Sequence, residues 1–194
     1  MNRQQLAHVL RAACEITGDA RVLVVGSQAI LGSFDEDNLP SSATASLEAD
    51  IAFFDDQSRG KADAVEGAIG EFSAFHQMNG YYAEGIHIDT VVLPKGWEDR
   101  VAGWTLVSSQ PAEPLFLDVH DLGIAKLMAG REKDLEFVGA LIDCGMLNLG
   151  VLVERCELLP EDAHSEAVGR VRSYLRSRAD SSVEESPDVK PSSG

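Results

Sequence analysis

Residues 21–32 read RVLVVGSQAILG, and residues 47–54 read LEADIAFF. The first stretch joins a short apolar run to a Gly-Ser turn and a helix-compatible segment, which predicts a buried strand that leads into a helix. The second stretch has the length of a strand, and strand side chains alternate between the two faces of a sheet. Glu48 and Asp50 therefore share one face, while the apolar residues between and beside them point to the other face.

Length, composition and charge limit the class of protein. The chain has 194 residues, of which 44% are hydrophobic, and this predicts one globular domain or one domain with a helical appendage. The formal net charge of −16 argues against a broad basic face that grips nucleic acid. No apolar stretch reaches the roughly 18 residues that a membrane-spanning helix needs, and the first residues predict an amphipathic helix and no signal peptide. We therefore expect no membrane partner.

The cysteines indicate the redox environment. Cys14, Cys144 and Cys156 are odd in number and lack the spacing of metal ligands. Free thiols of this kind are typical of proteins in a reducing compartment. The sequence therefore predicts free cysteines and a cytoplasmic location.

Periodicity and turn residues predict the order helix, strand, helix, strand, helix, strand and then helices. Apolar spacing over residues 4–16 gives the first helix, which Thr17-Gly18 ends, and polar residues over 33–46 predict a loop. A third strand is expected over residues 84–94, where a proline ends it. Further helices are expected over residues 61–74, 121–130, 133–144, 149–158 and 163–176.

This order of elements predicts an α+β fold, in which a mixed sheet is flanked by helices and followed by a helical C-terminal part. We expect the α/β core over residues 1–115 and the helical region, packed on the core, over residues 116–176. Apolar residues nearly vanish after Arg176, so residues 177–194 are predicted to form a disordered tail.

The carboxylates and the Gly-Ser turn suggest a metal and phosphate site. Mg²⁺ prefers oxygen ligands, usually a few carboxylates together with phosphate oxygens. Glu48 and Asp50 supply two carboxylates, and Asp89, on the expected third strand, is the candidate for a third. Backbone N–H groups at Gly26 and Ser27 are candidates for holding phosphate. The alternatives are a solvent-facing strand edge for the carboxylates and a helix cap for Ser27.

Three cations follow in the helical region. Lys126 lies on the polar side of an otherwise apolar helix, and Arg131 and Lys133 follow at the next junction. A cation that contacts triphosphate oxygens, or the leaving pyrophosphate, offsets the charge that develops during phosphoryl transfer. The alternatives are a helix lysine that extends to solvent, and junction charges that pair with Glu132 or Asp134.

Together these motifs resemble the polymerase-β-type nucleotidyltransferase superfamily. The Gly-Ser turn, the carboxylate-x-Asp strand and the segment DLGIAKLMAGREKD over residues 121–134 carry the resemblance. Within the superfamily, the chain is most similar to the nucleotidyltransferase-like proteins of bacterial abortive-infection and type IV toxin–antitoxin systems. The similarity covers about two-thirds of the chain, residues 20–145. It implies a nucleotidyltransferase-like fold and a Mg²⁺ (or Mn²⁺) cofactor.

The resemblance also implies roles for single residues. Ser27 would bind phosphate, with Gly26 beside it, and Lys126 would contact the nucleotide. Glu48 and Asp50 would bind metal, although the family usually has aspartate at the first of these two positions. Asp89 would be the third carboxylate, as a metal ligand or as the base that activates the acceptor oxygen. Arg131 and Lys133 complete the expected nucleotide site.

The leading hypothesis is a Mg²⁺-dependent nucleotidyltransferase in a toxin–antitoxin or phage-defence system. It would move a nucleoside monophosphate from a nucleoside triphosphate to a hydroxyl of RNA, such as a tRNA end, or of protein, with a cognate toxin or antitoxin as partner. One alternative is a non-catalytic nucleotide-binding or partner-binding module, which the glutamate at position 48 and the acidic charge favour. Another is a small-molecule nucleotidyltransferase, since an acidic protein suits cationic substrates.

Overall fold

The computed structural model describes residues 1–104 and 106–184. Within them, five strands form one mixed sheet in the order β3-β2-β1-β5-β4. Neighbours are antiparallel in the pairs β1–β2 and β4–β5 and parallel in the pairs β1–β5 and β2–β3. The strands are β1 (Leu23–Val24), β2 (Glu48–Ala52), β3 (Tyr82–Gly85), β4 (Ala102–Gly103) and β5 (Leu115–Phe116).

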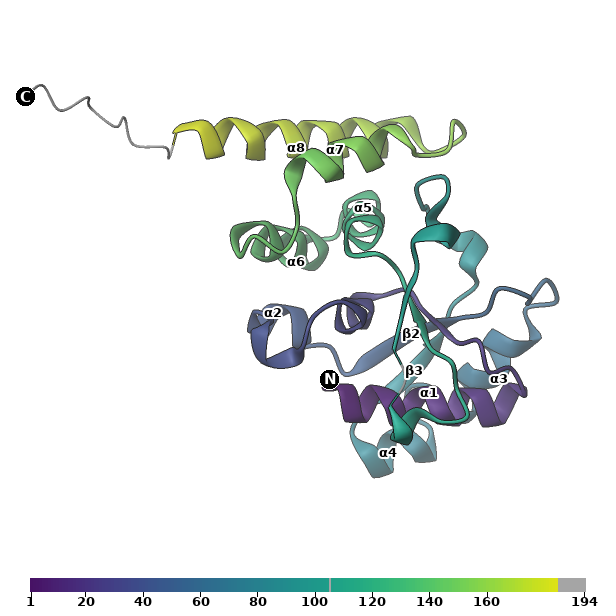
Figure 1. Cartoon of the computed structure of the whole chain (residues 1–194). Coiled ribbons are helices and arrows are strands. Elements are labelled where there is room, and N and C mark those ends of the chain that lie inside the picture. Colours follow the sequence, from purple (N-terminus) through teal and green to yellow (C-terminus); the bar gives the residue numbers. More distant parts are fainter. Residues whose placement is uncertain (105, 185–194) are drawn as a thin grey trace, which may run out of the picture.

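Helices cover both sides of this sheet. Figure 1 shows α1, α3 and α4 on one side and the C-terminal helices α5 to α8 on the other. The α-helices are α1 (Arg3–Thr17), α2 (Ser41–Thr44), α3 (Gly60–Ile69), α4 (Ala74–Asn79), α5 (Val119–Ala129), α6 (Glu132–Asp143), α7 (Leu149–Glu157) and α8 (Ser165–Glu184). Short 3₁₀ helices are η1 (Ser27–Gly32), η2 (Glu36–Asn38), η3 (Ile88–Thr90), η4 (Trp97–Arg100) and η5 (Val107–Ser109). The predicted α+β class, with a helical C-terminal part, is confirmed.

Helix α1 begins and ends as its sequence predicts. The Asn2 side chain accepts a hydrogen bond from the Gln5 N–H, and the Gln5 side chain accepts one from the Asn2 N–H, which is a capping box. At the other end Gly18 has φ 69°, a left-handed conformation that glycine adopts without strain. The buried face repeats at helical spacing through Leu6, Val9, Leu10 and Ala13.

The alternation predicted for the second strand is confirmed. Ala49 and Ile51 are fully buried, whereas Glu48 and Asp50 lie half-buried on the opposite face of β2. β5 spans the expected boundary between the α/β core, residues 1–115, and the helical region, residues 116–176. Both predicted regions therefore contribute to the sheet.

The segment after the Gly-Ser turn differs from the prediction. It forms the 3₁₀ helix η1 and not an α-helix, and residues 33–46, expected as a loop, contain η2 and α2. The Arg3 guanidinium donates hydrogen bonds to the carbonyl oxygens of Leu31 and Phe34, which ties this segment to α1. A contact with a residue so far away in the chain is not visible in local sequence.

The third strand is shorter than predicted. β3 ends at Gly85, one residue before a last hydrogen bond from the Ile86 N–H to the Ile51 carbonyl oxygen of β2. Gly85 lies directly against α3, where a Cβ would stand 2.0 Å from the carbonyl oxygen of Ala62. The Gly85 N–H donates a hydrogen bond to the Glu66 carboxylate of α3. The chain then turns into η3, so Asp89 is not part of the sheet.

Helix α5 is the centre of the C-terminal part. Its N-cap is Asp118, whose carboxylate accepts hydrogen bonds from the N–H groups of His120 and Asp121, and Gly130 (φ 66°) ends it. α5 packs against α6, α7, α8 and η1. Because it is enclosed in this way, most of its side chains are buried, and they include Lys126.

The prediction of a disordered tail from residue 177 is wrong for residues 177–184, which continue α8; residues 185–194 lie outside the described part. Val171 and Leu175 are buried and anchor this helix. Arg178 then pairs with Asp143 of α6, and the Ser177 hydroxyl donates to a carbonyl one turn earlier. Composition alone does not reveal these contacts.

Two further predictions concern the whole chain. Cys14, Cys144 and Cys156 are free, as expected. Among the described helices, none combines the length and the apolar character that crossing a membrane requires.

Candidate metal centre

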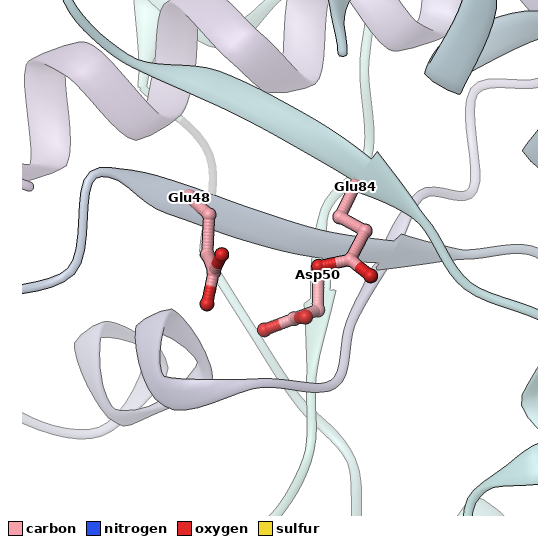
Figure 2. Close-up of side chains that lie close together, drawn as sticks. All are labelled: Glu48, Asp50 and Glu84. Carbon is pink, nitrogen blue, oxygen red and sulfur yellow. The ribbon is translucent and has the colours of Figure 1, made fainter. Parts of the chain in front are cut away.

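Three carboxylates converge where β2 and β3 run side by side. In the parallel register of these strands, Asp50 is paired with Glu84 and Glu48 with Tyr82. Figure 2 shows Glu48 and Asp50 along β2, with Glu84 beside Asp50 on the neighbouring strand. One oxygen from each of the three carboxylates lies within 4.8 Å of the others. This group can hold a metal ion.

The electrostatics of the three carboxylates agree with that role. Burial raises the pKa of Asp50 above its ordinary value, and the charge of Glu48 raises it further. Burial, followed by the charges of Asp50 and Glu48, likewise raises the pKa of Glu84. Glu48 and Asp50 are half-buried and Glu84 is exposed, and the like charges of the three carboxylates repel one another. Lys126, Arg131 and Lys133 offset part of this repulsion at Asp50, and a divalent cation between the carboxylates would offset more.

Gly26 makes room for the central carboxylate. A Cβ on Gly26 would stand 1.4 Å from Oδ2 of Asp50, so the Asp50 carboxylate occupies the space that any larger residue would need. Gly26 has φ −92°, which every residue adopts, so the requirement for glycine comes from this close approach and not from backbone strain. The glycine predicted to lie near phosphate therefore touches a metal-ligand candidate instead.

Gly26→Ala is expected to weaken Mn²⁺ binding at least about tenfold, because the new methyl group displaces the Asp50 carboxylate and metal ligands must keep their geometry to within about 0.5 Å. Calorimetric titration with Mn²⁺ measures this change. The matched control is Gly67→Ala in α3, where an added Cβ meets nothing within 4 Å, and this variant should bind Mn²⁺ as the wild type does. Equal Mn²⁺ affinity in the Gly26 variant would contradict the close-approach argument.

The predicted cations lie next to the carboxylates. Lys133 Nζ is 4.0 Å from Glu48 Oε1, and Lys126 lines the same pocket as the three carboxylates. Lys126 is 9% exposed, so the alternative of a lysine that extends to solvent is wrong. Arg131 lines this pocket as well. The structure thus brings together the carboxylates of β2 and the three predicted cations.

Asp134 holds two of these cations in place, and its role at the site was missed from sequence. Its carboxylate accepts hydrogen bonds from Lys126 Nζ at 3.0 Å and from Arg131 Nε at 2.6 Å. Burial acts to raise the pKa of Asp134, but the hydrogen bonds from Arg131 and Lys126 outweigh burial and hold the pKa below its ordinary value. The predicted alternative, that Arg131 pairs with Asp134, is confirmed. The i, i+3 spacing of this pair is the signal in the sequence.

Two hollows meet at this site. The first, of about 320 Å³, contains the three carboxylates and has an apolar wall that includes Val91, Leu122 and Met128. The second, of about 360 Å³, is lined by Ser27, Ser42, Ser46 and Lys133, among others. Glu48 and Lys126 line both hollows and therefore stand between them.

Ser27 is the first residue of η1, and the cap position belongs to Gly26, so the alternative that Ser27 caps this helix is wrong. Ser27 instead lines the second hollow together with Lys126 and Lys133. The same hollow also contains Glu48, Asp134 and Glu136, so Ser27 lies in a polar environment of mixed charge.

Asp89 lies elsewhere, and its predicted placement beside Glu48 and Asp50 is wrong. It belongs to η3, is 64% exposed and pairs with Arg59 at 2.8 Å. The prediction required the third strand to continue to residue 94, but that strand ends at Gly85. Glu84 is the third carboxylate in place of Asp89. The signal in the sequence is that Glu84 is the first residue of the predicted third strand.

The comparisons with known proteins leave the family open. No family model matches the chain, and no curated protein and no solved structure matches it. The functional argument therefore rests on the geometry of the carboxylates and the neighbouring cations.

Proposed function

We propose that the protein is a metal-dependent nucleotidyltransferase, which moves a nucleoside monophosphate from a nucleoside triphosphate to an acceptor hydroxyl and releases pyrophosphate. The observation that carries the proposal is the convergence of Glu48, Asp50 and Glu84, with the cations Lys126, Arg131 and Lys133 lining the adjoining hollows. Transfer of this kind needs clustered carboxylates for a cation and positive charge for the phosphates. Both lie within one site here.

The donor set fits Mg²⁺ or Mn²⁺. All three candidate ligands are carboxylates, the hard oxygen donors that these ions prefer, and they lie on two paired strands that hold them in place. A bound ion would neutralise phosphate charge and polarise the phosphoryl oxygens. Glu48, Asp50 and Glu84 are the residues that would hold it.

The chain's own cations would act on the phosphates. Lys126 and Lys133 line the second hollow with the Ser27 hydroxyl, and they offer hydrogen-bond donors to triphosphate oxygens. Arg131 lies at the first hollow, next to the carboxylates. Because Asp134 holds Lys126 and Arg131, their positions are set before substrate arrives, and preorganised charge is the most effective kind in catalysis.

The acceptor and the biological setting come from the sequence resemblance. We propose a hydroxyl of RNA, such as a tRNA end, or of protein as the acceptor, and a toxin–antitoxin or phage-defence system in the cytoplasm, with a cognate toxin or antitoxin as partner. The three free cysteines suit a reducing compartment.

A second candidate function is a non-catalytic nucleotide-binding or partner-binding module. The glutamate at position 48 favours it, as does the pairing of Lys126 and Arg131 with Asp134, which offsets part of the positive charge available to a nucleotide.

Transfer of label separates the two functions. The protein is incubated with α-³²P-labelled nucleoside triphosphates, Mg²⁺ and total tRNA or a cognate partner, and we expect label on the acceptor that chelation by EDTA abolishes. Glu84→Gln should reduce transfer more than about tenfold, because it removes a ligand charge, whereas Asp89→Asn should leave transfer unchanged. If the folded protein binds no triphosphate in calorimetry, the transferase proposal fails. Binding without transfer supports the non-catalytic module.

A further inference from the structure

Tyr82 contacts Glu48, one of the three candidate metal ligands. Its hydroxyl donates a hydrogen bond to Oε2 of Glu48 at 3.1 Å. The two residues are register partners in the parallel pair β2–β3, so the contact is fixed by the sheet itself. The other oxygen of the same carboxylate, Oε1, faces Lys133 Nζ at 4.0 Å.

Tyr82 is in turn supported by α4. The His76 ring lies against the Tyr82 ring, with centroids 4.6 Å apart. The His76 ring is held by a hydrogen bond that its Nδ1 accepts from the Phe72 N–H, and the His76 backbone N–H donates to Oγ of Ser73, the N-cap of α4. The hydroxyl that reaches Glu48 therefore comes from a side chain with a packed neighbour.

A glutamate needs such support more than an aspartate does. It has one more rotatable bond, so its carboxylate samples more positions unless something holds it, and ordering it costs entropy. A metal ligand must keep its place to within about 0.5 Å. A hydrogen bond to one carboxylate oxygen selects one orientation and leaves the second oxygen for the ion.

We propose that Tyr82 is a positioning residue that holds the Glu48 carboxylate in a metal-binding orientation. The inference rests on the proposed function in that it requires a metal ion at this site. It assigns no contact between Tyr82 and the ion or the substrate.

Titration with Mn²⁺ alone, with free Mn²⁺ measured by electron paramagnetic resonance, tests this role without any catalytic assay. Tyr82→Phe removes only the hydroxyl, and we expect roughly tenfold weaker Mn²⁺ binding. The matched control is Tyr81→Phe: the neighbouring hydroxyl also makes one hydrogen bond, to His8 Nδ1 at 2.8 Å, but away from the carboxylates. This control should bind Mn²⁺ as the wild type does.

The pair Glu48→Gln and Glu48→Gln/Tyr82→Phe separates positioning from a general structural effect. If Tyr82 acts through Glu48, its substitution should change the affinity less than about twofold once the Glu48 charge is gone. His76→Ala, which loosens Tyr82 but keeps its hydroxyl, should give a weakening smaller than that of Tyr82→Phe.

Wild-type affinity in Tyr82→Phe would overturn the inference, and so would an equal tenfold loss in the Glu48→Gln background. If the wild type itself binds no Mn²⁺, the metal centre and the proposed function fall together with the inference. Binding by the wild type with no effect of Tyr82→Phe removes the inference alone.

Discussion

Asp50→Asn is expected to abolish Mn²⁺ binding and nucleotidyl transfer, and yet to leave the metal-free protein at least as stable as the wild type. Asp50 is central in the candidate metal centre, with Glu84 as its register partner and Gly26 directly against its carboxylate. Loss of this ligand should weaken binding by more than about 100-fold, beyond the 10- to 100-fold typical of residues that only support a ligand. Sites built for function often cost stability in this way.

The sign of the stability effect follows from the pKa of Asp50. Burial and the charge of Glu48 raise that pKa, so the folded state binds the Asp50 proton more tightly than the unfolded chain does. In metal-free buffer, the contribution of Asp50 to the free energy of unfolding therefore becomes more favourable as pH falls through the raised pKa. This contribution is lost as pH rises through the same pKa. Asparagine carries no charge at any pH, so this contribution to the pH dependence should disappear in the variant.

Urea unfolding with and without Mn²⁺ measures both effects. At a Mn²⁺ concentration 100 times the dissociation constant, the wild type should gain about 2.7 kcal/mol in free energy of unfolding, and the Asp50 variant should gain nothing measurable. Asp55→Asn, an exposed carboxylate just beyond β2, is the control and should keep the full gain. The assignment of the metal centre fails if the Asp50 variant is stabilised by Mn²⁺ as much as the wild type.

Asp121→Asn is expected to cost about 3 kcal/mol in free energy of unfolding, which is the low end for breaking a buried ion pair. The Asp121 side chain is fully buried between two arginines. Arg100 donates to it through Nε at 2.7 Å and Nη2 at 3.0 Å, and Arg155 Nε lies 3.3 Å away. The substitution leaves the guanidinium groups of Arg100 and Arg155 without the Asp121 charge. Because each arginine is 21% exposed, water hydrates it in part, and this limits the loss of free energy of unfolding.

Chemical denaturation at pH 7 measures this cost. The matched control is Glu157→Gln, which breaks the Arg172–Glu157 pair, whose side chains are 54% and 62% exposed. An exposed pair of this kind contributes less than about 1 kcal/mol. Similar losses in the two variants would show that the Arg100–Asp121–Arg155 cluster contributes no more than a surface pair.

Local sequence patterns predict two of the three carboxylates of the candidate metal centre. Glu48 and Asp50 were placed on one face because strand alternation depends only on neighbouring residues. The predicted third carboxylate, Asp89, is wrong because β3 ends at Gly85 and the chain turns into η3, although the apolar and β-branched residues over 86–92 favour a continued strand. Lys126 was predicted to contact a nucleotide, but its pairing with Asp134 depends on the packing of α5 against α6.

The C-terminal helix shows the same limit. The composition after Arg176 is that of a disordered segment, yet α8 continues to residue 184. Buried residues earlier in the helix, Val171 and Leu175, together with the Arg178–Asp143 pair, supply stability that the composition of the last turns does not. Contacts between helices therefore keep residues 177–184 helical where their composition predicts disorder.

The order of the strands also sets the order of assembly during synthesis. β1, at the centre of the sheet, pairs with β2 on one side and with β5 on the other, and β5 follows β1 in the chain only after most of the α/β core. Such distant pairing closes slowly, because the entropy of a long loop is lost before the contacts form. As a ribosome releases the chain from its N-terminus, β1, β2 and β3 can assemble first and bring the three carboxylates together, while one edge of β1 stays unpaired. Because that open edge is only two residues long, Leu23–Val24, it offers little template for pairing with another chain before β5 arrives.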